Sequence, residues 1–462
     1  MNDNILSDNH QVVNDATALY RQKEYVRAYE KVRPLMVKGE VPPTSTFSCA
    51  WIICRYIKQM SDNLSLDNLN VCVGFFLSNI VSEPSLVRSV FLSQMIDISK
   101  KCKEFDFLSF CCKFDILNLR QEDYIGNKAV LSERVVRYES LAEKLATRIY
   151  NVMKSSKTRQ CASLLMPFLM KVKEKCPENK FIDMYIGLMN YWMGNRELAY
   201  KLFVEILLTN PQWYIWKNMS YVTDDHDKKV AFLCKAITMI DDERYKGNLH
   251  LQLAEMLSDS DPSHAAMEIA RFFETYSKNN WRICGDAYIL QNKLKGISAA
   301  TDSYSFYMQN AKNAENVVYK DVDAIEMSFV REVMVHGKRK AKFQALNSKT
   351  SINVSLSMLG RKVNVGDVFS VRYKMHDHSL VVLTLDFLRA CPNGSNIHME
   401  KLLEVSGNVS LPRSGGFAFI DKKYYVSNKL RSKCQLTEGQ NVKAVVCQAE
   451  DGRWRVVKIL KY

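Results

Sequence analysis

The hydrophobic period of this chain changes once, and the change divides the chain into two parts with different secondary structure. From about residue 14 to residue 296, apolar side chains recur at intervals of three and four, which places them on one face of an α-helix. In 368–373 and 380–387 they alternate, as is typical of β-strands. The stretch 298–323 is polar and weakly periodic. The pattern therefore predicts a multidomain α + β fold, with helices first and strands after.

The spacing within the helical part indicates stacked helical hairpins. Ala199, Phe203, Ile206 and Pro211 follow Gly187 by 12, 16, 19 and 24 residues, and this spacing resembles one tetratricopeptide repeat. Small residues let two antiparallel helices approach, and larger side chains fill the groove to the next repeat. Similar offsets occur at two further sets of positions: Ala16, Leu19, Ala28, Val32 and Leu35, and Ala254, Leu257, Ala266, Ala270 and Phe273. The resemblance implies an α-solenoid.

The helical part is expected to be all-α. This includes residues 64–138, which fit no clean repeat register, so the number of repeats there stays open. Carboxylates at 224–227 and 241–243 fall at expected turns, where they are typical of helix caps. Metal binding by 224–227 or by 376–378 (His-Asp-His) is the less favoured alternative, because consecutive residues rarely converge on one ion.

Positive charge is concentrated at the C-terminal end of the chain. The chain has 64 Lys and Arg against 50 Asp and Glu, and residues 331–462 hold 23 of the former and 10 of the latter. The first 330 residues, with 41 against 40, are close to neutral. Segregation of this kind indicates that the C-terminal part faces a polyanion, of which nucleic acid is the first candidate.

Residues 407–459 resemble a cold-shock domain, which is a small OB-fold barrel. Residues 415–420 (GGFAFI) match the first aromatic motif of that family, 424–427 (YYVS) stand where the second belongs, and 436–442 (LTEGQNV) match a late turn before a strand. The resemblance implies binding of single-stranded nucleic acid. Two departures reduce the site: residues 410–412 hold no aromatic residue, and Ser427 replaces a histidine.

The site implied by this resemblance is an aromatic surface flanked by cations. Phe417 and Phe419 share one face of a strand, and Tyr425 on the next strand can join them to stack on bases. The alternative is that these rings face the core or a partner protein. The predicted phosphate contacts are Arg413, Lys422, Lys423, Lys429, Arg431, Lys433, Lys338, Arg339 and Lys340.

A second barrel of the same kind is predicted before the first. Residues 363–369 (VNVGDVF) repeat the order turn, glycine, strand of 436–442. The basic run 336–342 is either a phosphate contact or a solvated loop. The predicted domains are a helical solenoid over 1–300, a linker over 301–325, one OB-like barrel over 326–400 and the cold-shock-like barrel over 401–462.

The sequence contains none of the phosphate-loop, nucleophile-elbow or zinc-protease motifs that mark common enzymes. Its 13 cysteines include no Cys-x-x-Cys pair, which favours a reducing cytoplasm. We expect no stretch that spans a membrane, and no cofactor or metal.

The function expected is that of a non-catalytic adaptor. Its barrels bind single-stranded nucleic acid, RNA rather than DNA, and its helical repeats bind a protein partner in their groove. One alternative is a scaffold or regulator in a bacterial stress or phage-defence system without direct nucleic-acid contact. The other is a nuclease or processing enzyme with an unrecognised site.

Overall fold

The computed structural model describes residues 2–80, 83–131, 134–156, 159–346, 350–376, 379–390, 402–412, 416–448 and 453–461. The helical part contains α1 (Asn2–Arg21), α2 (Tyr25–Lys38), η1 (Pro43–Ser45), α3 (Thr46–Met60), α4 (Leu66–Asn79), α5 (Leu86–Lys101), α6 (Phe107–Lys113), η2 (Gln121–Tyr124), β1 (Asn127–Leu131), β2 (Arg134–Tyr138), α7 (Leu141–Ser156), α8 (Arg159–Lys175), α9 (Phe181–Trp192), α10 (Arg196–Thr209), α11 (Trp213–Val222), α12 (His226–Thr238), η3 (Glu243–Tyr245), α13 (Gly247–Leu257), α14 (Pro262–Lys278), α15 (Gly285–Lys293) and α16 (Ser303–Val318).

The β-rich part follows α16 and contains β3 (Ala324–Val335), β4 (Lys338–Ala345), β5 (Ser351–Ser355), η4 (Leu356–Leu359), β6 (Val368–His376), β7 (Ser379–Arg389), β8 (Leu402–Ser410), β9 (Ala418–Ile420), β10 (Tyr424–Val426), α17 (Asn428–Cys434), β11 (Asn441–Gln448) and β12 (Trp454–Lys461). The predicted α + β architecture is confirmed. In the described residues no helix has the length and apolarity that a membrane crossing needs.

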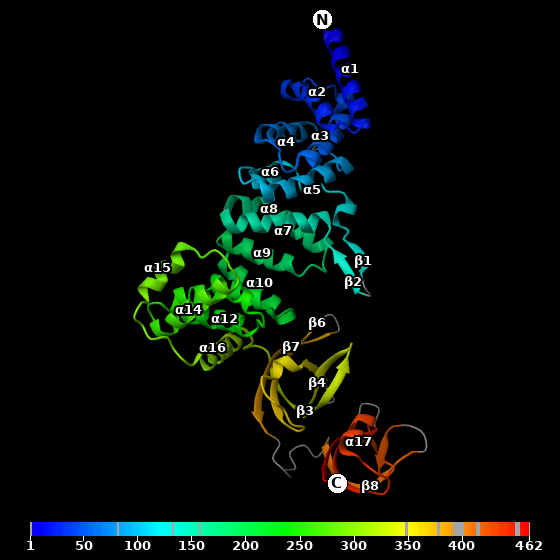
Figure 1. Ribbon diagram of the computed structural model, residues 1–462, viewed down its shortest axis with the longest axis vertical. Coiled ribbons are helices and arrows are strands. Elements are labelled where there is room, and N and C mark those ends of the chain that lie inside the picture. The colour runs from blue at the N-terminus through cyan, green and yellow to red at the C-terminus, as the bar shows by residue number, and fades with distance from the viewer. Residues whose placement is uncertain are drawn as a thin grey trace. The chain divides into compact units, whose positions relative to one another are not determined.

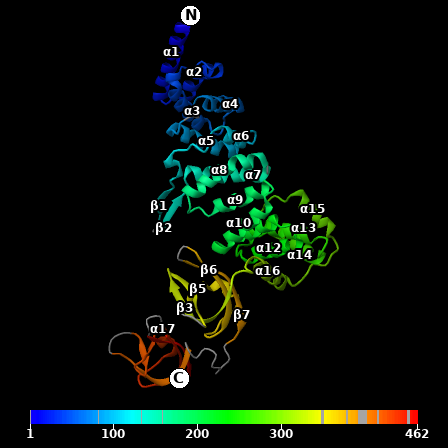
Figure 2. The same ribbon diagram turned by 180° about the vertical axis from the view of Figure 1, so that it is seen from behind.

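The chain separates into two compact units. The first consists of Met1–Ile206 with Asn218–Asp224, and the second of Leu207–Lys217 with Asp225–Tyr462. In the first unit successive helices pack as neighbours, α1 on α2, α2 on α3, α7 on α8 and α8 on α9 (Figure 1). In the second unit α13 packs on α14, and α12 packs on both α13 and α16 (Figure 2). Stacked helical hairpins are therefore observed, as the repeat spacing predicts.

The hairpin of α9 and α10 depends on Gly187. A Cβ atom at this position would lie 2.6 Å from Cε1 of Phe203, so the two helices pack in direct contact there. Phe203 and Ala199 are fully buried, and Gly194 turns the chain between the helices with a φ of 88°. Asn190 is polar at a position where the repeat prefers an apolar residue. It is buried, and its Nδ2 donates to the carbonyl oxygen of Ile186 at 2.9 Å.

The register predicted for α14 is wrong by one residue. Ala270 is exposed and Phe273 is only partly buried, whereas Ala265 and Phe272 are fully buried. The buried face of α14 also carries Glu268. This charged residue interrupts the apolar pattern from which the sequence would reveal the buried face.

Glu268 is accommodated by partners from two other helices. Its Oε2 lies 2.6 Å from Nδ1 of His250 on α13, and its Oε1 accepts from the hydroxyl of Tyr307 on α16. All three side chains are buried, and a buried carboxylate is tolerated when it is hydrogen-bonded in this way.

The prediction of an all-α region is wrong for residues 127–131 and 134–138. They form two antiparallel strands in which Asn127 pairs with Tyr138 and Leu131 with Arg134. Adjacent valines at 135 and 136 and the tyrosine at 138 are residue types that favour strands, because their side chains fit a pleated surface.

The predicted linker over 301–325 is also corrected, because it contains α16. Tyr307, Ala311, Ala314 and Val318 lie three or four residues apart on this helix and are buried. Interspersed asparagines lower the mean hydropathy of the segment and conceal this period in the sequence. Asp302 caps the helix by accepting from the backbone N–H of Ser305.

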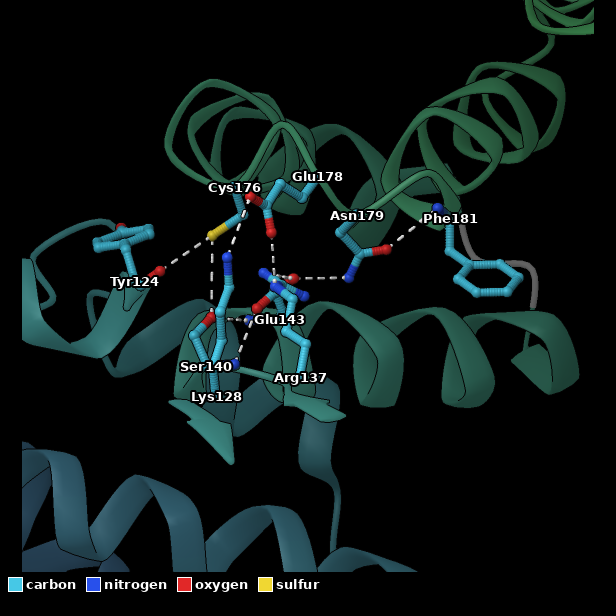
Figure 3. A network of polar contacts seen from close by, with 9 residues as sticks. All are labelled: Tyr124, Lys128, Arg137, Ser140, Glu143, Cys176, Glu178, Asn179 and Phe181. Carbon is cyan, nitrogen blue, oxygen red and sulfur yellow. Dashed lines mark hydrogen bonds and ion pairs between the residues drawn. The ribbon is translucent and has the colours of Figure 1, made fainter. Parts of the chain in front are cut away.

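A buried carboxylate joins the hairpin to the helices of the first unit (Figure 3). Glu143 accepts from Nη2 of Arg137 at 2.8 Å, from Nδ2 of Asn179 at 3.0 Å and from the backbone N–H of Ser140 at 2.8 Å. Ser140 Oγ in turn accepts from the N–H of Glu143 at 3.2 Å, which completes a capping box at the start of α7. Arg137 also pairs with Glu178 at 3.1 Å. The network thus links β2, α7 and the turn between α8 and α9.

The five-stranded sheet of β3–β7 and the closed barrel of β8–β12, called the second barrel below, share one strand order. In the sheet, the order is β5-β4-β3-β6-β7, and in the barrel it is β10-β9-β8-β11-β12 with β10 also paired to β12. In chain order both read third, second, first, fourth, fifth. A five-stranded barrel is therefore observed in the C-terminal region, as predicted, whereas the region predicted as a first barrel is an open sheet in the described residues.

Replacement of Gly187 by alanine should destabilise the first unit. Alanine favours a helix by about 1 kcal/mol over glycine, but a methyl group inside contact distance of the buried Phe203 ring costs about 1–3 kcal/mol. We expect Gly187→Ala to lower the denaturant midpoint. Gly74→Ala is the matched control, because the new methyl group meets nothing within 4 Å, and it should raise the midpoint. A stabilised Gly187→Ala would contradict the close packing of α9 on α10.

Replacement of Glu143 by glutamine should cost about 2 kcal/mol or more of unfolding free energy, because a buried charged acceptor is lost. Burial raises the pKa of the Glu143 carboxyl, but hydrogen bonds from Ser140, Arg137 and Asn179 outweigh it, so the pKa is lowered from its ordinary value of 4.5. The advantage of the wild type should therefore be complete above that value and disappear as the pH falls through the lowered pKa.

Denaturant unfolding of both proteins between pH 7 and pH 3 measures this difference. Glu197→Gln is the control, since Glu197 is an exposed residue in the first turn of α10, and its effect should stay within about 0.5 kcal/mol. A pH-independent difference for Glu143→Gln would refute the role of its charge.

Candidate nucleic-acid interface

The second barrel places aromatic side chains on its outer surface by strand alternation. In β9, Ala418 and Ile420 are fully buried and Phe419 between them is partly exposed. In β10, Val426 is fully buried and Tyr425 is partly exposed. The core beneath them is formed by these residues with Val409, Leu436, Val442, Ala444, Val446, Val456 and Ile459. The strands must keep this register, because a slip of one residue would bury the aromatic rings instead.

Phe417, Phe419 and Tyr425 form one aromatic cluster, as the sequence predicts. The ring centroids are 5.7 Å apart for Phe417 and Phe419, 5.6 Å for Phe417 and Tyr425, and 5.9 Å for Phe419 and Tyr425. Phe419 and Tyr425 are direct cross-strand partners. Ring planes at 87° and 72° show that Phe419 packs edge-to-face with the other two. The three rings therefore pack against one another on the outer surface of the barrel.

The turn between β9 and β10 holds an aspartate and a lysine in a costly backbone conformation. Asp421 and Lys422 have φ of 49° and 54°, and the N–H of Lys423 donates to the carbonyl oxygen of Ile420 at 3.1 Å. A left-handed conformation costs a non-glycine residue about 1–2 kcal/mol. Asp421 Oδ1 compensates by accepting from the backbone N–H of Asn408 at 2.9 Å.

The absence of a side chain at Gly407 makes room for the carboxylate of Asp421. A Cβ atom at position 407 would lie 2.2 Å from Oδ2 of Asp421, so only glycine leaves room for the carboxylate above β8. The turn is thereby tied to the neighbouring strand. Lys422 and Lys423 are exposed, and Nζ of Lys423 lies 5.2 Å from the centroid of the Tyr424 ring.

The helix α17 follows β10 directly and explains the departure at Ser427. The side chain of Ser427 accepts from the backbone N–H of Leu430, so this residue is the N-cap of α17 rather than a member of the aromatic cluster. On α17, Arg431 is partly exposed and Lys433 is exposed. Arg413 and the side chain of Lys429 lie outside the described residues.

Arg455 is a member of this surface that sequence reasoning missed. Its parallel pairing with Tyr425 places both residues on the same face of the sheet. The neighbouring residues Trp454 and Val456 pack toward the core, so alternation alone indicates that Arg455 points outward. Its position beside Tyr425 depends on barrel closure, which no local pattern predicts. Arg455 adds a cation next to the aromatic cluster.

The basic residues 338–340 point to two different faces of β4. Lys338 pairs with Val335 and Lys340 with Val333, while Arg339 pairs with Met334 on the opposite face. Arg339 also forms an ion pair with Glu332. The three residues predicted together at this position are therefore not brought together.

One carboxylate in each of the segments 224–227 and 241–243 caps a helix, as predicted for these segments. Asp225 accepts from the N–H of Lys228 at the start of α12, and Asp242 accepts from the N–H of Arg244 at the start of η3. Nε2 of His226 lies 2.9 Å from the carbonyl oxygen of Met256. Asp377 and His378 lie outside the described residues. Among the residues that the structure describes, no three His, Cys, Asp or Glu side chains gather as a metal site would require.

Buried cysteine thiols of the helical part have low reactivity. Burial raises the pKa of the Cys49 and Cys72 thiols to about 12. A thiol with so high a pKa is protonated near neutral pH and is a poor nucleophile and metal ligand.

Comparison with known protein families gives a match within the helical part. Residues 180–314, less than a third of the chain, match a family described as a domain of unknown function (DUF7017), and this segment runs from the start of α9 into α16. A search of curated proteins found no match.

Proposed function

We propose that this protein binds single-stranded nucleic acid through the aromatic cluster of its second barrel, and RNA in preference to DNA. The observation that carries the proposal is the preformed cluster of Phe417, Phe419 and Tyr425 on the outside of β9 and β10. A barrel that only needed stability would bury such rings, since each buried aromatic side chain contributes about 1.5–3 kcal/mol. Exposed rings offer stacking to bases.

The charges near the cluster support a nucleic-acid ligand over a protein ligand. Lys422 and Lys423 extend from the turn that joins the two aromatic strands, and Arg455 lies beside Tyr425. Stacking on rings combined with cations for phosphates is the general mode of single-strand binding, and it has little sequence preference. The preference for RNA rests on the resemblance to the cold-shock family.

In this proposal the helical hairpins bind a protein partner, and the protein acts as an adaptor. The support is a set of exposed apolar side chains on and beside α15. Trp281 is 44% exposed, Tyr288 49% and Ile289 69%. Exposed patches of this kind often mark interaction sites. Tethering would raise the local concentration of the partner near the bound strand.

Ile289→Asp in the full chain tests the adaptor arm. The proposed protein-binding role would be supported if a protein copurifies with the wild type and not with this variant, while both bind nucleic acid with the same affinity. Equal retention by both proteins would remove α15 from the proposal.

Alanine substitution of the rings tests the nucleic-acid arm. Each of Phe417→Ala, Phe419→Ala and Tyr425→Ala should weaken binding of a short labelled strand by about 1–3 kcal/mol, since each removes a stacking surface. Fluorescence anisotropy with the full chain, on RNA and DNA of one sequence, measures the loss and the preference between the two.

Tyr304→Ala is the matched control, because Tyr304 is 68% exposed on α16 and outside the barrel. It should leave the affinity unchanged, and thermal melting should show that all four variants stay folded. If the ring variants fold and bind like the wild type, the barrel does not bind by stacking.

A further inference from the structure

Two thiols from different helices meet in the first unit. Cys112 lies on α6 and Cys161 lies near the start of α8, and α6 packs on α8 (Figure 1). The two cysteine side chains are in hydrogen-bond contact with each other. They are 49 positions apart in the chain, so the fold rather than the local sequence brings them together.

The pair lies at the edge of the packed helices, where solvent reaches it. On α6, Cys111 is buried, whereas its neighbour Cys112 is exposed. On α8, Cys161 precedes the buried Leu165 by four residues, which places both residues on one side of the helix, and Cys161 is partly exposed. A reagent dissolved in water can therefore reach this pair of cysteines.

Another pair of thiols in the same unit is shielded from solvent. Cys54 and Cys72 are close enough to interact electrostatically, but both are fully buried. Burial raises the pKa of both thiols above the ordinary value of 9.0, so they stay protonated near neutral pH. The comparison shows that contact between two thiols and access to them are separate conditions, and Cys112 with Cys161 meets both.

The arrangement of Cys112 and Cys161 is the one that a disulfide requires. A disulfide joins residues whose Cα atoms lie about 4.4–6.8 Å apart and whose side chains face each other. Two thiols that already contact each other also react as groups of one molecule, so the cost of bringing two reactants together is absent. Oxidation of the first thiol is then followed by attack of the second.

We infer that Cys112 and Cys161 form a site of reversible oxidation, at which a hydroperoxide converts the two thiols into a disulfide between α6 and α8. With hydrogen peroxide, the sulfur of Cys112 attacks one oxygen, the O–O bond breaks, and Cys112 becomes a sulfenic acid as one water leaves. The sulfur of Cys161 then attacks the sulfenic sulfur, and a second water leaves as the S–S bond forms. The thiols lose two electrons and two protons, which reduce one peroxide to two waters.

The inference is independent of the proposed function, and the environment of Cys112 sets how fast the site reacts. Burial raises the pKa of the Cys112 thiol, and the neighbouring Cys161 raises it further. The thiolate is the reactive form, so oxidation should be slow near neutral pH and faster as the pH rises. The site therefore responds to sustained exposure to an oxidant.

The disulfide would stabilise the middle of the first unit. It closes a loop that runs from α6 through η2, β1, β2 and α7 to α8. This loop contains Glu143 and its hydrogen-bond donor Arg137. A bond that closes a loop of about 50 residues restricts the unfolded chain and so favours the folded state.

Peptide mapping of the full chain tests the bond directly. The reduced protein is treated with hydrogen peroxide, the remaining thiols are alkylated, and the digest is analysed by mass spectrometry. The wild type should yield two peptides joined through Cys112 and Cys161, and dithiothreitol should separate them. The joined peptides should accumulate faster at pH 9 than at pH 7, as the raised pKa of Cys112 requires.

Thermal melting measures the effect on the fold. The oxidised wild type should melt on the order of 10 °C above the reduced protein, and dithiothreitol should reverse the shift. Cys112→Ser and Cys161→Ser should give neither the joined peptides nor the shift. Cys284→Ser is the matched control, because it removes an exposed thiol of the second unit, and it should behave like the wild type.

Three results of the peptide map would overturn the inference: a bond between other cysteines in place of this pair, a bond between two molecules, or a sulfinic acid at Cys112 with Cys161 unmodified. A lower melting temperature of the oxidised wild type would also overturn it, because the bond would then distort the packing of α6 on α8. The map of the wild type does not depend on the folding of any variant.

Discussion

The candidate site depends on the parallel pairing of β10 with β12, which closes the second barrel. This pairing is short, with Tyr425 opposite Arg455 as its register. It joins the third strand to the fifth, so the aromatic strands β9 and β10 are held from both sides. Without closure β10 would be an edge strand three residues long, and edges of that kind are poorly fixed. Barrel closure therefore determines where the aromatic rings lie, in addition to completing the fold of the barrel.

The sheet of β3–β7 shows what the same strand order gives when no such pairing forms. It has β5 at one edge and β7 at the other, and in the described residues these two edges are not joined. Each of these edge strands is paired on one side alone, whereas every strand of the second barrel has two neighbours. The proposed stacking site therefore lies on the more constrained of the two strand arrangements.

The sequence predicts the parts of this structure whose signals are local. The periodic residues of α9 and α10, the alternation around Phe419 and the caps at Asp225 and Asp242 all follow from neighbours within a few positions. The errors at α14 and α16 have one cause in common, namely polar residues on or beside buried helix faces. Glu268 hides the stripe of α14, and the asparagines of α16 give a packed helix the composition of a linker.

The missed member of the aromatic surface has a different origin. Arg455 comes beside Tyr425 through a pairing between residues 30 positions apart in the chain. This arrangement has no local signature, because it is set by which strands pair and in which register. Alternation predicts that the side chain of Arg455 points outward, but only the fold shows that its neighbour is Tyr425.

The aromatic surface lowers the stability of the barrel that carries it. Three aromatic rings stay partly exposed, and Lys422 takes a left-handed conformation. Each arrangement costs on the order of 1 kcal/mol in a domain with a small core. Packing elsewhere must compensate for them, as the buried residues under β9 and β10 and the hydrogen bond from Asn408 to Asp421 do. In the proposed function, these costs have a common explanation in a ligand that lessens them on binding, since stacked bases would cover the rings.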